Sequence, residues 1–229
     1  MDVDIFIAPK KTVVEIESQC VLLNWRLMAL RKMRINLLRL TFIPVIFLAV
    51  FARPSWLPNE NVFTDFIMEL GGYLFLLAGL MIRIWCIFYI GNRKSKELVT
   101  EGPYSICRNP LYVGTFLLAI GVGLSFASPF MVLSVLVIVV PVHVITARME
   151  ETNLGTLFGE EYRMYKRKVD RFWPNFSNYT SPETLSVNVH SIRRIFFDTT
   201  GVLLLPWIED WLELLREQGI IPVLWHSPF

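Results

Sequence analysis

The chain has 229 residues, of which 54% are hydrophobic and 18% are charged, and its formal net charge is +2. Soluble domains have about a quarter of their residues charged, so this composition excludes an ordinary soluble domain and indicates an integral membrane protein. We find no basic stripe interleaved with aromatic residues and expect no nucleic-acid partner.

Residues 1–36 form a basic N-terminal segment that begins with acidic residues and lacks the pattern of a cleaved signal peptide. Membrane insertion is therefore expected to come from later spans. The three cysteines, Cys20, Cys86 and Cys107, are scattered without CxxC spacing. They are interpreted as packing residues, and neither a disulfide framework nor a bound metal is expected.

Apolar residues between positions 37 and 147 predict about four transmembrane helices. Residues 37–52 are short for a bilayer crossing, which needs about 20 apolar residues, whereas residues 66–90 are long enough. Within the second span, Gly72 and Gly79 lie on one face, where a neighbouring helix can approach closely. Residues 111–147 are apolar except for a break at 125–129, which predicts two short helices in a hairpin.

Lysine and arginine collect in three segments: before the first span, between the second and third, and after the fourth. Four crossings place all three on one side, which the positive-inside rule assigns to the cytoplasm. We therefore expect an all-α, multi-pass membrane protein whose termini and functional site are cytoplasmic. The expected core is residues 37–174, followed by a linker and an amphipathic tail at 175–229. The oligomeric state is left open.

The tail has a helical pattern of its own. Pro206 can start a helix and Gly219 can end one, and between them Trp207 and Trp211 face opposite acidic residues such as Glu209. An acidic polar face is poorly matched to anionic lipid, so we expect this helix to dock on protein, with the basic segment before the first span as a candidate partner, instead of lying on the bilayer.

The first segment with chemical interest leads from a turn into the third span. Asn109 is expected to cap this helix and Pro110 to occupy its first position. Two interpretations of Arg108 stay open. It is either an anchor at the membrane surface or, beside a helix N-terminus, part of a site for an anion such as a ligand carboxylate.

A second segment emerges directly from the fourth span and carries Glu150 and Glu151 near the depth of the lipid headgroups. Carboxylates there are costly unless they are paired or functional. Pairing with Arg148 within one helical turn would be a structural role, and facing a cationic ligand would be a functional one. If the helix is continuous, Glu150 and Tyr162 share one face, which could flank an adenine ring.

Two more ionisable residues lie within the spans. Arg83 is interpreted as reaching toward the cytoplasmic surface, with a role at a site as the alternative. His143 is interpreted as a hydrogen-bonded packing residue, with a catalytic base as the alternative.

The order of several separated motifs resembles the isoprenylcysteine carboxyl methyltransferase family over about residues 102–174. Phospholipid N-methyltransferases share a related carboxyl-terminal pattern, and membrane sterol reductases have a related helical architecture. The elements that carry the resemblance are Gly102-Pro103-Tyr104, Arg108-Asn109-Pro110-Leu111-Tyr112-Val113-Gly114, Glu150-Glu151, Phe158-Gly159-Glu160-Glu161-Tyr162, Tyr165, Val169 and Pro174.

This resemblance implies S-adenosylmethionine as cofactor, a cofactor site at the cytoplasmic ends of the last spans, and a lipophilic methyl acceptor that enters sideways from the lipid bilayer. It implies a catalytic role, orienting the acceptor, for Arg108 and Arg148. The family usually has His where this chain has Asn109, which donates a hydrogen bond but carries no charge at neutral pH. The residues expected to bind the cofactor are Arg108, Asn109, Pro110, Tyr112, Glu150, Glu151 and Tyr162.

The expected activity is carboxyl O-methylation of an isoprenylcysteine or a similar lipid-like acceptor. The first alternative is a phospholipid N-methyltransferase. A nicotinamide-dependent membrane reductase and a scaffold without catalytic activity are the remaining alternatives.

Overall fold

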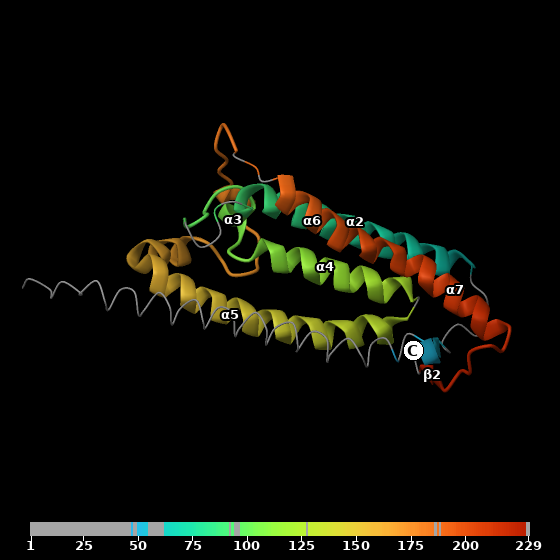
Figure 1. Ribbon diagram of the computed structural model, residues 1–229. Helices are drawn as coiled ribbons and strands as arrows, with labels where there is room; N and C mark the ends of the chain where they lie inside the picture. Colours follow the sequence, from blue (N-terminus) through green and yellow to red (C-terminus); the bar gives the residue numbers. More distant parts are fainter. Residues whose placement is uncertain are drawn as a thin grey trace, which may run out of the picture. The chain divides into compact units, whose positions relative to one another are not determined.

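The computed structural model describes residues 47, 50–54, 62–91, 93, 97–126, 128–185, 187 and 189–227 (Figure 1). The basic N-terminal segment and most of the expected first span lie outside these residues. The described chain is helical apart from one pair of three-residue strands, so the expected helical class is confirmed. Its elements are β1 (Ala52–Pro54), α2 (Val62–Ile90), α3 (Pro103–Ile106), α4 (Pro110–Ser125), α5 (Pro129–Lys168), η1 (Phe176–Asn178), α6 (Val189–Thr200), η2 (Gly201–Leu204), α7 (Leu205–Glu217) and β2 (Trp225–Ser227).

Two described helices are long and apolar enough to cross a membrane: α2 between Phe66 and Ile90, and α5, which begins at Pro129. Helix α4 is apolar too, but its 16 residues span only about 24 Å at 1.5 Å per residue. The number of crossings therefore stays a prediction.

Glycines bring α2 and α4 into close contact. A Cβ atom on Gly79 would lie 2.7 Å from the backbone oxygen of Gly114, and one on Gly121 would lie 2.9 Å from the backbone oxygen of Gly72. Real Cβ atoms do not approach backbone so closely, so this seam requires small residues. The close approach predicted at Gly72 and Gly79 is confirmed.

Helices α4 and α5 pack on one another on either side of the predicted break. The Ser128 side chain caps α5 by accepting from the backbone N–H of Met131, and Pro129 opens the helix. A Cβ atom on Gly123 would lie 2.5 Å from the Cα of Val132, so the two helices begin their contact at the joint itself.

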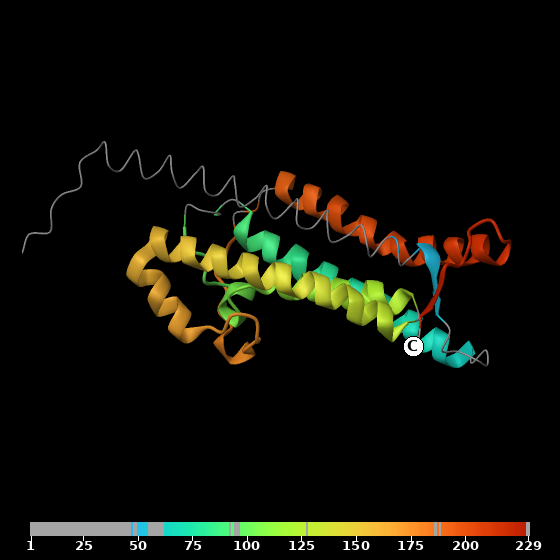
Figure 2. The ribbon, with the colours of Figure 1, turned by 90° about the horizontal axis from the view of Figure 1, so that it is seen from below.

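Helix α5 changes direction at Gly159, whose φ of 53° and ψ of −118° are not helical. Figure 2 shows the last turns of α5 folding back from this point. A continuous helix through Glu150 and Tyr162 was the condition for their sharing one face, and that expectation is wrong. Only glycine adopts this backbone conformation readily, which explains why the chain turns here.

The C-terminal helices lie along the bundle: α6 and η2 contact α2, and α7 contacts α4 (Figure 1). Beyond α7, β2 pairs in parallel with β1, with Trp225 opposite Ala52. Nearby, the backbone N–H of Leu224 donates to the carbonyl of Phe51 at 3.1 Å. The end of the chain is thus tied to the segment that precedes α2.

Helix α7 has the predicted bounds, because Pro206 lies in its first turn and Gly219 follows it with a φ of 71°. Trp207 and Trp211 are 68% and 71% exposed, whereas Glu209, near Arg216 at 3.9 Å, is buried. The basic segment that was the candidate docking partner lies outside the described residues, so docking on it stays a prediction.

Candidate functional site

The predicted turn at Gly102 is held by the segment that follows α5. The Gly102 backbone N–H donates to the carbonyl of Thr180 at 2.6 Å. Gly102 has a φ of 59°, and a Cβ atom there would lie 2.3 Å from the ring of Tyr89. Glycine is required on both counts, and it allows the short helix α3 to begin immediately at Pro103.

The Arg108 segment pairs with a segment about 60 residues further along the chain. The backbone N–H of Arg108 donates to the carbonyl of Asp170 at 2.8 Å, and that of Asn109 donates to the carbonyl of Arg171 at 3.0 Å. The Tyr165 hydroxyl donates to the carbonyl of Tyr104 at 2.7 Å. The reversal at Gly159 makes these contacts possible by returning the end of α5 to the start of α4.

Glu151 is the centre of an ion-pair network in which its side chain is only 5% exposed. Arg171 donates a hydrogen bond to each carboxylate oxygen, from Nε to Oε1 at 2.9 Å and from a terminal nitrogen to Oε2 at 2.8 Å. Asn109 donates to Oε1 at 3.1 Å, and Arg108 Nε lies 3.4 Å from the same oxygen. The hydrogen bonds to Glu151 raise the pKa of the Arg171 guanidinium above its ordinary value.

This network gives the Asn109 side chain a defined partner. Asn109 occupies the N-cap position of α4, but its side chain makes no capping hydrogen bond. It donates to Glu151 instead. Because Arg108 and Arg171 already supply two positive charges to this carboxylate, a neutral donor is sufficient at position 109.

Glu150 belongs to a second, adjacent pair. The Tyr112 hydroxyl donates to Oε2 of Glu150 at 2.8 Å and so joins α4 to α5. The Tyr112 ring meets the edge of His143 with centroids 5.2 Å apart. Since His143 is buried and its Nδ1 lies 2.8 Å from the carbonyl of Val139, its interpretation as a hydrogen-bonded packing residue is confirmed.

Three polar side-chain atoms around these pairs are buried without a hydrogen-bond partner among the described residues: Arg108 Nε, Tyr162 Oη and Asn153 Nδ2. Tyr162 is 3% exposed, and its ring approaches Gly155, one turn after Glu151. Buried polar groups usually have partners, so unpaired donors beside carboxylates are a feature that a polar ligand can satisfy.

Two other arginines that the sequence analysis considered are Arg148 and Arg83. Arg148 is exposed on α5, and no hydrogen bond or ion pair joins its side chain to the described residues of the cluster. Arg83 donates to the hydroxyl of Thr115 at 2.8 Å and so has a partner on α4. Pro110 is buried at the first position of α4, where it sets the backbone and offers no polar side chain.

Sequence analysis missed Arg171 and Asn153. Arg171 lies inside the motif region, yet it was read only as one of the cytoplasmic basic residues. Its spacing from Glu151 carries no helical or strand periodicity, because the turn at Gly159 intervenes. Asn153 is one turn beyond Glu150, and that i+3 spacing was an available signal.

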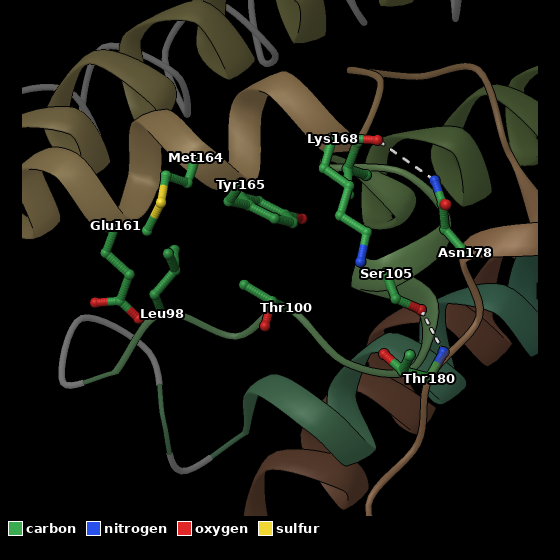
Figure 3. A pocket seen from close by; sticks show the side chains of 10 residues that line it. Leu98, Thr100, Ser105, Glu161, Met164, Tyr165, Lys168, Asn178 and Thr180 are labelled. Atoms are coloured by element: carbon green, nitrogen blue, oxygen red, sulfur yellow. Dashed lines mark hydrogen bonds between the residues drawn. The ribbon is translucent and has the colours of Figure 1, made fainter.

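A cavity of about 300 Å³ lies beside the motif region (Figure 3). The side chains of Lys168 and Tyr165 come from the last turns of α5, and those of Thr100 and Ser105 lie across from them. None of the residues predicted to bind the cofactor lines it. The cavity and the Glu151 network therefore have no residue in common.

Comparison with known proteins bears on this arrangement. The family model described as phospholipid methyltransferase matches residues 67–161, which include most of α2, all of α4 and both glutamates. Over 137 residues the chain is 32% identical to the human protein-S-isoprenylcysteine O-methyltransferase, covering 52% of this chain and 48% of that enzyme. Over these ranges the chain is similar to phospholipid methyltransferases and isoprenylcysteine methyltransferases. The predicted resemblance is confirmed.

Two further relatives are bacterial. The cobalt-zinc-cadmium resistance protein CzcN of Cupriavidus metallidurans is 34% identical over 140 residues, covering 61% of this chain and 64% of the relative. The nickel-cobalt-cadmium resistance protein NccN of Alcaligenes xylosoxydans xylosoxydans is 29% identical, covering 84% and 89%. The matched part thus spans less than two thirds of CzcN and about half of the human enzyme. No solved structure matches the chain.

Proposed function

We propose that this protein is a multi-pass membrane methyltransferase that uses S-adenosylmethionine and methylates a lipophilic acceptor. The observation that carries the proposal is the meeting of two motifs about 40 residues apart. Tyr112 bonds to Glu150, and Asn109 bonds to Glu151, where α4 begins and the apolar part of α5 ends. Family relatives that are methyltransferases support it.

The donor set fits the proposed cofactor. A methionyl carboxylate needs hydrogen-bond donors, and Tyr162 Oη and Asn153 Nδ2 are buried donors without hydrogen-bond partners among the described residues. Arg108 adds a positive charge nearby, although its Nε already forms an ion pair with Glu151. The positively charged sulfonium and ammonium groups of the cofactor need a carboxylate nearby. The half-buried Glu150 can supply one. When bound, the cofactor supplies a methyl group activated by a positively charged sulfur.

The protein's own contribution is then mainly to position the reactants. Glu151 accepts from Arg171 and Asn109 and so fixes the Arg108 segment against α5. Tyr112 orients Glu150. A carboxylate acceptor is already deprotonated at neutral pH and needs no base, but it needs a cation to orient it. We propose this role for Arg108, with the exposed Arg148 as a second cation at the surface.

The proposed topology follows the basic segments. Arg108, Lys166, Lys168 and Arg171 lie at the end of the bundle where α2 finishes and α4 starts. The positive-inside rule assigns this end to the cytoplasm. A water-soluble cofactor reaches it from that side, while an apolar acceptor reaches it from the bilayer.

The test is binding of S-adenosylmethionine to the detergent-purified protein by calorimetry. The Glu150→Gln variant keeps the size of the side chain and removes its charge, and Glu160→Gln does the same on an exposed residue outside the cluster. We expect saturable binding by the wild type, a loss of at least about tenfold in Glu150→Gln and no change in Glu160→Gln. Absence of binding to folded wild type at millimolar cofactor would refute the proposal.

Phospholipid N-methylation is a second candidate activity, because the matching family model bears that description. Incubation with cofactor carrying an isotopically labelled methyl group distinguishes the two. A prenylcysteine analogue that gains a base-labile methyl ester supports carboxyl methylation. Label that stays on the headgroup amine of phosphatidylethanolamine after base treatment supports the lipid activity.

A part in metal resistance is suggested by the names of CzcN and NccN. It is tested by growth of a cadmium-sensitive host that expresses either the wild type or Glu150→Gln. Protection by the wild type alone would connect tolerance to methyl transfer. Equal protection by both proteins would separate tolerance from that chemistry.

A further inference from the structure

The C-terminal helices follow α2 from one end of the bundle toward the other. At the end of α2, the Tyr89 hydroxyl lies 2.9 Å from that of Ser181. Helix α6 and η2 then contact α2, and the Trp207 side chain lies near the Tyr73 hydroxyl. Tyr73 and Tyr89 are separated by about 24 Å along the helix. The segment from Ser181 to Trp207 therefore covers most of a membrane thickness beside α2.

Contacts made by the last turn of α7 and by β2 place the end of the chain near the residues that precede α2. Arg216 Nε donates to the carbonyl of Val50 at 3.3 Å, and β2 pairs with β1. Both partners precede α2 in the chain, whereas the candidate site lies where α2 finishes. The C-terminus and the site are thus at opposite ends of the α2 helix.

The side chains exposed along this path are apolar and aromatic. Phe197 is 67% exposed, and Leu204 and Trp207 are exposed to a similar extent. On α2 itself, Phe66 and Leu74 are exposed as well. Since α2 is a candidate membrane span and the C-terminal helices pack beside it, exposed apolar side chains on both indicate that both face lipid.

Length and charge agree with a crossing. Residues 195–208 contain one charged residue, Asp198, and span about 21 Å, close to the length of the apolar helix α4. Arg193 and Arg194 precede this stretch at the end near the site. Acidic residues that begin with Glu209 follow it at the other end. This polarity matches the positive-inside rule with the site on the cytoplasmic side.

We propose that α6, η2 and α7 together cross the membrane beside α2 and place the C-terminus on the side opposite the candidate site. The occupant of the exposed apolar face is the lipid bilayer. This replaces the expectation of a cytoplasmic C-terminus. The segment was overlooked as a crossing because its amphipathic helices lack a long uniformly apolar run; packing against α2 shields one face.

Labelling of engineered cysteines in sealed membrane vesicles tests the proposal. In a Cys20→Ser background, Gln218→Cys reports on the end of α7, and Ser177→Cys reports on the segment beside the site. Arg167→Cys is a control on the last turn of α5. All three positions are exposed, whereas the remaining natural cysteines, Cys86 and Cys107, are buried.

We expect a membrane-impermeant maleimide to label Gln218→Cys from one side, and Ser177→Cys and Arg167→Cys only from the other. Labelling of all three from the same side would overturn the proposal. A C-terminal fusion of the full chain adds a second measurement: alkaline phosphatase should be active and green fluorescent protein dark, and the reverse result would also overturn it. Neither readout requires cofactor binding, so this proposal and the proposed function can fail separately.

Discussion

Arg171 holds the candidate site together through its two hydrogen bonds to Glu151, at 2.9 and 2.8 Å. Arg171→Met keeps much of the aliphatic length and removes both bonds, leaving a carboxylate that is 5% exposed with Asn109 and Arg108 as partners. Hydrogen bonds to charged groups contribute about 1.5–3 kcal/mol each. Because the Arg171 side chain is 30% exposed, water compensates part of this loss.

We therefore expect Arg171→Met to lower the free energy of unfolding by about 2 kcal/mol in total, or roughly 30-fold in the ratio of folded to unfolded protein. For a chain of this length the melting temperature falls by roughly 4–8 °C, measured by circular dichroism in detergent. Arg171→Lys keeps the charge but not the bidentate geometry, so its melting temperature should lie between those of the wild type and Arg171→Met.

Arg163→Met is the matched control, because Arg163 makes an exposed ion pair with Glu160 on the same part of α5. Such pairs contribute about 0.5 kcal/mol or less. If Arg171→Met melts at the same temperature as Arg163→Met, the Glu151 network does not stabilise the site and the reasoning is refuted.

Three further predictions concern packing, backbone and thiol reactivity. Gly79→Ala places a Cβ atom 2.7 Å from a backbone oxygen of α4 and should lower the free energy of unfolding by about 1–3 kcal/mol. In the control Gly71→Ala the nearest atom is 3.7 Å away, and this variant should melt like the wild type. Equal melting temperatures of the two variants would exclude a tight seam. Gly159→Ala forces alanine to a φ of 53° and should lower the free energy of unfolding by about 1–3 kcal/mol, although no atom is near enough to clash. An unchanged melting temperature would show that alanine tolerates the turn. Burial raises the pKa of Cys107 to about 11. Iodoacetamide at pH 8 should therefore modify this thiol slowly in the folded protein and quickly after denaturation, as followed by mass spectrometry. Equal rates would contradict its burial.

The sequence predicted the parts of this protein that depend on local order. Apolar length located α2 and the α4 and α5 pair, and proline and glycine marked both ends of α7. The order of motifs predicted the resemblance that the comparisons confirm, whereas the roles of Arg108, Tyr112 and the two glutamates stay predictions. These predictions succeeded because helix periodicity, turn residues and motif spacing are properties of neighbouring residues.

The tertiary structure decided which residues meet and which faces are exposed. Gly159 reverses the chain, and only that reversal lets Arg171 reach Glu151 from 20 residues away. The orientation of α7, with Trp207 exposed and Glu209 buried, follows from contacts with segments distant in the chain. An amphipathic pattern shows that a helix has two faces. What covers each face depends on packing against distant segments, and periodicity within one helix does not encode that choice.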